Sequence, residues 1–150
     1  MNDFRVKISD TRCGVRATAL IVKNRCLLVT RDDRGVYYTI GGGVSVNEIS
    51  SDSLQREVKE EVGGDIKSSQ LAFIVENFFT HNEENFHNIE FHYLVELANN
   101  PQMKMNENGT IQQCEWVDFD HLAEIDLRPS FLKDKLPKWQ QLEHIINKGV

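Results

Sequence analysis

Residues 42–64 hold the side chains of this sequence that are best placed to carry out chemistry. The segment reads GGVSVNEISSDSLQREVKEEVGG and combines glycines, a run of carboxylates and one arginine. On a helix, which turns about 100° per residue, Glu57, Glu60 and Glu61 fall within one arc of about 100°. That arc borders an apolar stripe, which consists of Leu54, Val58 and Val62.

Three glutamates on one arc repel one another, and such pairs cost a few tenths of a kcal/mol each on an exposed helix. The nearest lysine, Lys59, lies on about the opposite side of the helix and does not offset them. A bound hard cation explains the arrangement, because Mg²⁺ takes oxygen ligands and is held by one or two carboxylates together with substrate phosphates. The segment therefore predicts a site for a divalent cation and a phosphate-containing ligand.

The spacing also resembles a known signature. Gly42, Glu48, Arg56-Glu57, Glu60-Glu61 and Gly63 fit the Nudix box of the Nudix hydrolase family, whose pattern continues with a bulky aliphatic residue where this chain has Gly64. That departure affects the packing expected at the helix exit and leaves the acidic positions intact. The resemblance implies an α/β protein, a Nudix-type α/β/α sandwich with a mixed β-sheet, formed as a single Nudix hydrolase domain over residues 1–150.

The same resemblance implies a Nudix pyrophosphohydrolase. Its reaction would be the metal-dependent cleavage of the pyrophosphate bond in a nucleoside diphosphate linked to another group X, such as a nucleoside triphosphate or ADP-ribose, assisted by Mg²⁺ or Mn²⁺. A divalent ion neutralises the pyrophosphate, lowers the pKa of a bound water and stabilises the leaving phosphate. The alternative is a catalytically silent Nudix-like nucleotide-binding or sensor module. Such modules usually lose box glutamates, and their retention here favours the enzyme.

Each charged residue that matches the Nudix box has a predicted role. The predicted metal ligands are Glu57, Glu60 and Glu61, and the predicted catalytic residues are Glu57, Glu61 and Arg56. Glu57 is the first choice for the general base, and a carboxylate from outside the box is the competitor. Arg56 is expected to orient a box carboxylate through a bidentate pair, or else to form a surface pair with Glu60. Glu48 either pairs with Arg56 or coordinates the metal.

Outside the helix, Glu90 and Glu115 on predicted strands are candidates for the additional carboxylate, with Glu115 also a possible metal ligand. Each is equally consistent with a solvated strand residue. Gly42 and Gly43 are predicted to bind substrate phosphates, because a backbone without Cβ atoms allows a close approach. Several aromatic residues could stack a base, although most are expected in the core: Tyr37, Tyr38, Phe78, Phe79 and Trp116.

The composition of the chain restricts the kinds of molecule that it is expected to bind. The 150 residues carry a net charge of −6, which argues against binding to a nucleic-acid polymer and leaves a small nucleotide substrate as the expected partner. The three cysteines include no CxxC pair, so no zinc site is predicted. No apolar run approaches the ~18 residues of a membrane span, and the polar start lacks a signal peptide. We expect a cytoplasmic enzyme without membrane contact, and the resemblance adds a possible homodimer.

Periodicity predicts the other elements. Strands are expected at 4–8, 14–22, 25–30, 36–40, 70–80, 89–97 and 110–119, with hairpins between the second and third and between the fifth and sixth. A glycine turn is expected at 41–43, a loop at 99–109, a helical turn at 120–124 and an irregular segment at 127–137. Residues 138–148 are predicted to form an amphipathic helix, with an apolar stripe formed by Trp139, Leu142, Ile145 and Ile146.

Overall fold

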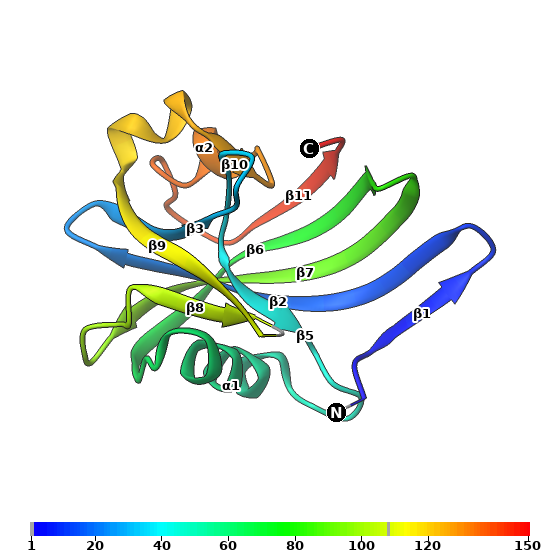
Figure 1. Ribbon diagram of the computed structural model, residues 1–150, viewed down its shortest axis with the longest axis horizontal. Helices are drawn as coiled ribbons and strands as arrows, with labels where there is room; N and C mark the ends of the chain where they lie inside the picture. Colours follow the sequence, from blue (N-terminus) through cyan, green and yellow to red (C-terminus); the bar gives the residue numbers. More distant parts are fainter. Residues whose placement is uncertain (1, 108) are drawn as a thin grey trace.

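The computed structural model describes residues 2–107 and 109–150, which form a mixed β-sheet with helices on both faces. Figure 1 shows helix α1 (Ser50–Val62) below the sheet and the short helix α2 (Leu132–Lys135) above it. A 3₁₀ helix, η1 (Phe119–Glu124), contacts α2 on the upper side. The structure thus has the predicted α/β/α layers.

Eleven strands are present among the described residues: β1 (Arg5–Ile8), β2 (Thr11–Lys23), β3 (Cys26–Arg31), β4 (Val36–Tyr38), β5 (Ile40–Gly43), β6 (Ile66–His81), β7 (Glu84–Leu97), β8 (Lys104–Glu107), β9 (Thr110–Asp118), β10 (Asp126–Arg128) and β11 (Glu143–Lys148). The main path through the sheet is β10-β4-β3-β2-β7-β6-β11. β2 pairs with β7 in parallel, whereas β2–β3 and β6–β7 are antiparallel hairpins. Both predicted hairpins are confirmed.

Two apolar clusters fill the spaces on either side of the sheet. The first lies under α1 and includes Leu54, Val58 and Val62, the stripe predicted from the helical spacing. The second lies under η1, α2 and β10 and includes Phe73, Leu122, Leu127 and Leu132. Because α1 buries its apolar stripe in the first cluster, the acidic part of its surface remains available to a ligand.

The helix α1 ends as the sequence predicts. Gly63 adopts a left-handed conformation (φ 62°), and its N–H donates to the carbonyl of Lys59 at 3.1 Å. A Cβ at Gly64 would lie 2.8 Å from Cγ1 of Val58 and 3.1 Å from Cδ2 of Leu97, so this chain has no room for the aliphatic residue of the family pattern. The backbone of Gly64 occupies the space at the C-terminal end of α1 where the family pattern has a side chain.

The predicted C-terminal helix at 138–148 is wrong. Residues 143–148 form β11, which pairs in parallel with β6 from Glu143–Phe73 to Lys148–Phe78. Ile145 and Asn147 are buried, whereas Ile146 is exposed, so burial alternates with a period of two. The free edge of β6 provides backbone hydrogen bonds that the local helical spacing could not reveal.

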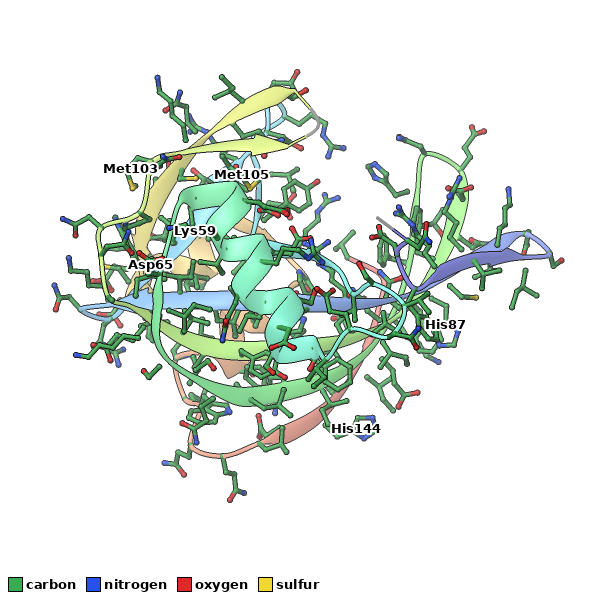
Figure 2. All side chains as sticks on the ribbon, turned by 90° about the horizontal axis from the view of Figure 1, so that it is seen from below. Lys59, Asp65, His87, Met103, Met105 and His144 are labelled. Atoms are coloured by element: carbon green, nitrogen blue, oxygen red, sulfur yellow. The ribbon has the colours of Figure 1, made fainter. Side chains whose placement is uncertain are left out.

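The segments predicted as a glycine turn and a loop contain strands. The glycine turn at 41–43 belongs to β5, which runs antiparallel to β2 with Gly43 opposite Arg16 and Gly41 opposite Thr18. Within the predicted loop 99–109, residue 108 lies outside the described residues, and 104–107 form β8 beside β9. Figure 2 shows Met105 next to α1, where its side chain joins the first cluster. No helix in the described ranges has the length and apolar character needed to cross a membrane.

Candidate active site

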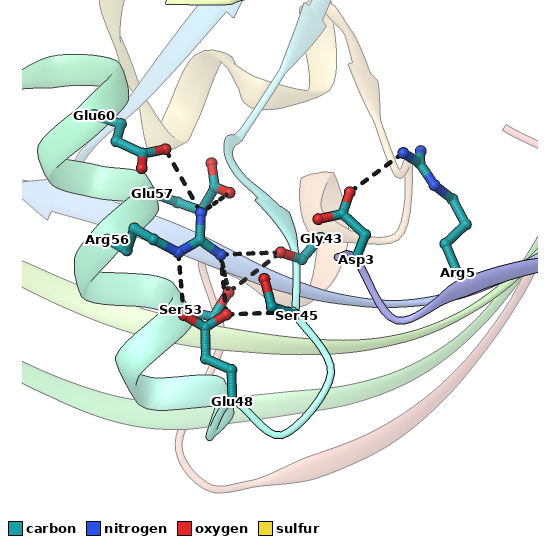
Figure 3. A network of polar contacts seen from close by, with 9 residues as sticks. All are labelled: Asp3, Arg5, Gly43, Ser45, Glu48, Ser53, Arg56, Glu57 and Glu60. Atoms are coloured by element: carbon teal, nitrogen blue, oxygen red, sulfur yellow. Dashed lines mark hydrogen bonds and ion pairs between the residues drawn. The ribbon is translucent and has the colours of Figure 1, made fainter. Parts of the chain in front are cut away.

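Arg56 is the centre of the polar contacts on α1 (Figure 3). Its Nε and Nη2 donate to the two carboxylate oxygens of Glu48 at 3.0 and 2.9 Å, a bidentate pair. Nη1 donates to Oε1 of Glu57 at 2.9 Å and lies 3.6 Å from Oε2 of Glu60. One guanidinium therefore contacts three carboxylates, while Lys59 on the same helix contacts Asp65 instead.

These contacts hold Glu48 in its charged form. The hydrogen bonds from Arg56, together with the backbone N–H of Ser45 at 3.0 Å, lower the pKa of Glu48 from 4.5 to about 2. The pKa of Arg56 is raised in turn, chiefly by Glu48. Of the two predicted roles for Glu48, the structure contains the pair with Arg56.

The carboxylate of Glu57 lies directly against the backbone of Gly42. A Cβ placed on Gly42 would be only 2.4–2.6 Å from the carboxylate atoms of Glu57, so no larger residue fits without moving that group. The neighbouring Gly43 accepts a 3.3 Å hydrogen bond from Arg56 through its carbonyl. Of the two predicted phosphate-binding glycines, Gly42 thus lies against the carboxylate of Glu57, and Gly43 contacts Arg56.

We therefore expect Gly42→Ala to impair activity more than stability. The new methyl group displaces the mobile end of Glu57 rather than a buried backbone segment, and misplacing a catalytic group by about 1 Å can cost about a hundredfold in rate. The checks are kcat and the melting temperature of the variant.

Gly43→Ala is the matched control for this prediction, since its methyl group would meet the carboxylate of Asp3 rather than Glu57. It should lose less activity than Gly42→Ala. Equal losses of activity would contradict the view that Gly42 leaves the space that the Glu57 carboxylate needs.

Glu60 and Glu61 lie in different surroundings. Glu60 is exposed, whereas Glu61 is 7% exposed and lines a cavity of about 480 Å³. Burial, and then the charge of Glu61, raises the pKa of the Cys114 thiol to about 11. In the conformation described for residues 2–107 and 109–150, no three His, Cys, Asp or Glu side chains converge closely enough to hold a metal ion.

Glu90 belongs to a separate buried network. Its two oxygens contact Nε2 of His92 at 2.9 Å and Nδ2 of Asn77 at 3.0 Å, and Asn77 in turn accepts from Asn147 of β11 at 2.9 Å. Burial alone would raise the pKa of Glu90, but the hydrogen bond and charge of His92 and the charge of Arg16 lower it to about 2. With both oxygens occupied, Glu90 is poorly placed to act as the additional carboxylate.

Glu115 is not brought to the helix carboxylates. Its neighbour Cys114 faces α1 in the first cluster, and Val117 faces the opposite layer in the second. Because side chains alternate along β9, Glu115 points away from α1 with Val117. The structure gathers Glu48, Arg56, Glu57 and Glu60 and leaves Glu115 outside.

Comparison with known proteins now adds to this geometry. The NUDIX domain model matches residues 13–139. The chain belongs to the NUDIX domain family. None of the curated proteins matches it by sequence.

Solved structures share the Nudix fold. A MutT protein from Bacillus halodurans superposes with a TM-score of 0.74 at 16% identity, covering 87% of this chain and 86% of that one. An ADP-ribose pyrophosphatase from Streptococcus suis has a TM-score of 0.62 at 16% identity, covering 89% and 98%. A putative Nudix hydrolase from Chromobacterium violaceum reaches 28% identity with a TM-score of 0.55, covering 79% and 71%.

The predicted family and fold are thereby confirmed, and so is the enzyme class, a Nudix pyrophosphohydrolase. Nudix enzymes act on small nucleotide substrates. Sequence reasoning missed the network around Glu90. The sequence does place Glu90 and His92 on the same face of a predicted strand. Two polar residues on one face suggest that this face is solvated rather than buried.

Proposed function

We propose that the chain hydrolyses the pyrophosphate bond of a nucleoside diphosphate linked to another group X, with Mg²⁺ or Mn²⁺ as cofactor. One observation carries the proposal. The acidic face of α1, organised by Arg56 and resting on Gly42, adjoins a cavity of about 480 Å³ through Glu61. A cavity of this volume is typical of small-molecule sites.

The residues present suit a divalent cation. Glu57, Glu60 and Glu61 offer hard oxygen donors within two helical turns, and Arg56 is also paired with Glu48, so it does not balance their charge. When bound, the cation would neutralise the pyrophosphate and activate a water molecule. Glu57 and Glu60 would turn toward Glu61 to hold it, while Arg56 keeps its bidentate contact with Glu48.

Proton transfer is assigned to Glu57. Its carboxylate rests on Gly42 at the edge of the site, and the competing carboxylates are disfavoured, since Glu90 is occupied by His92 and Asn77 and Glu115 points to the other layer. A positioned base of this kind contributes about 10²–10⁴-fold to the rate. This assignment requires that Arg56 holds the Glu57 carboxylate in place until substrate binds.

The substrate is proposed at the level of a class. A structural relative is described as an ADP-ribose pyrophosphatase and another as a MutT protein, and both have the fold described here. ADP-ribose and nucleoside triphosphates are therefore the first compounds to test. A single domain over residues 1–150, a cytoplasmic location and a homodimer stay predictions.

The test is incubation of the purified protein with Mg²⁺ and a panel of ADP-ribose, nucleoside triphosphates, dinucleoside polyphosphates and nucleotide sugars. Release of phosphate, pyrophosphate or a nucleoside monophosphate is measured, and we expect metal-dependent release from at least one compound. Chelation should stop it. Binding of a nucleotide without hydrolysis of any panel member would instead identify a nucleotide-binding module.

A further inference from the structure

The cavity beside Glu61 continues to the end of the β6–β7 hairpin, where Phe79 and Phe86 line it. In Figure 1 this end of the hairpin extends past α2 and β10. We propose that Phe79 and Phe86 form the surface on which the nucleobase of the substrate stacks, an inference that rests on the proposed function. The phosphates would then lie at the opposite end, near Glu61.

The two phenyl rings form a ready platform. Phe79 and Phe86 are partners in the β6–β7 register, and their rings stack in parallel with centroids 4.8 Å apart. Both are half-buried, so one side of the pair is supported and another faces the cavity. Stacking on such rings is tolerant of base identity, because every base has a π-face.

The neighbouring cross-strand pair of the same hairpin, Phe78 and His87, does not face the cavity. Phe78 stacks on His87 with centroids 4.3 Å apart, but side chains alternate along a strand, so this pair faces the other side of the sheet. Phe78 and Phe79 are equivalent as aromatic candidates in the sequence. The structure assigns the cavity side to Phe79.

The distance along the cavity suits a nucleotide. Arg16 lines the cavity and is the register partner of both Gly43 on β5 and Glu90 on β7, so this residue lies in the row next to the α1 site. Phe86 is four residues from Glu90 along β7, which corresponds to ~13 Å. A ribose with one or two phosphates spans such a gap, with Arg16 at the phosphate end and the phenyl rings at the base end.

A buried hydroxyl at the phosphate end also indicates a ligand, since the register places Thr18 opposite His92, two residues beyond Arg16 as seen from Phe86. Thr18 lines the cavity and is 1% exposed, and its Oγ1 has no hydrogen-bond partner among the described residues. Leaving a buried polar group unsatisfied is unfavourable, and an oxygen atom of a phosphate group or of the sugar would satisfy it. The hydroxyl is thus a second group positioned for the substrate, at the phosphate end of the cavity.

Calorimetric titration in the presence of Mg²⁺ tests the proposal without requiring turnover. The probes are adenosine, guanosine, cytidine and uridine monophosphates, with inorganic pyrophosphate as the probe that lacks a base. Phe79→Leu should weaken binding of nucleoside monophosphates about tenfold and leave pyrophosphate binding unchanged. Phe78→Leu, the matched control on the opposite face, should change neither.

Thr18→Val adds a second measurement. Valine keeps the shape and removes the hydroxyl, so binding of both nucleoside monophosphates and pyrophosphate should weaken about two- to tenfold with no fall in melting temperature. A hydroxyl with a purely structural role would instead lower the melting temperature and leave binding unaltered.

The outcomes separate this proposal from the proposed function. Three results would overturn the stacking surface. They are equal effects of Phe79→Leu and Phe78→Leu, a loss of pyrophosphate binding in Phe79→Leu equal to its loss of monophosphate binding, and failure of all four monophosphates to bind the wild type. Base-dependent binding without hydrolysis of any panel compound would support the stacking surface and reject the hydrolase. Hydrolysis with the same KM in Phe79→Leu as in the wild type would do the reverse.

Discussion

Replacing Glu57 or Glu61 by glutamine is expected to lower kcat by at least about a hundredfold, because each change removes a charge that the cation and the attacking water require. Glutamine keeps the size of the side chain, and at position 57 it can still accept the 2.9 Å hydrogen bond from Arg56. The fold should therefore survive. The measurements are Mg²⁺-dependent hydrolysis of the compound that the wild type cleaves, and the melting temperature.

Glu96→Gln is the control, because Glu96 is an exposed residue of β7 that pairs with Lys67 and does not line the cavity of Glu61. It should hydrolyse at the wild-type rate. Calorimetry with Mn²⁺ and a nucleotide provides a second readout, in which Glu57→Gln and Glu61→Gln take up the cation more weakly than wild type. Hydrolysis that persists unchanged in both variants would reject the proposed mechanism.

The elements that could be predicted from sequence are those with strong local patterns. The 3.6-residue spacing of Leu54, Val58 and Val62 placed α1 and its buried face, and Gly63 placed its end. The carboxylate arc and Arg56 followed from the same geometry. These features depend on neighbours within a few residues, so no tertiary information was needed to find them.

The elements that could not be predicted depend on distant strands. Residues 143–148 have an ambiguous pattern, and they become β11 because β6 offers an unpaired edge 70 residues away, as the Asn147–Asn77 hydrogen bond illustrates. The burial of Glu90 likewise follows from Asn77 on β6 and from the ring of Phe131 over His92. A polar alternation on one strand does not reveal which layer will cover it.

Arg56→Met is expected to lower the free energy of unfolding by about 2–3 kcal/mol and to reduce activity at least about tenfold. Removing one member of a buried charge pair costs 3–5 kcal/mol, and the lower figure applies because Arg56 is 21% exposed. The loss should depend on pH. The hydrogen bonds from Arg56, together with that from the Ser45 N–H, lower the pKa of Glu48 from 4.5 to about 2. The stabilisation from the Arg56–Glu48 pair is therefore complete above pH 4.5 and is lost as the pH falls toward 2.

Denaturant unfolding of wild type and Arg56→Met between pH 2 and 7 checks this dependence, and the difference between them should shrink on the acid side. Arg56→Lys keeps the charge, but an ammonium cannot donate in parallel to both oxygens of Glu48 while contacting Glu57, so it should restore only part of the stability and activity. In a double-mutant cycle with Glu48→Gln, the bidentate pair predicts a coupling of about 1 kcal/mol or more. Additive effects would mean that the Arg56–Glu48 pair does not stabilise the fold, and the role of Arg56 would then rest on its contact with Glu57.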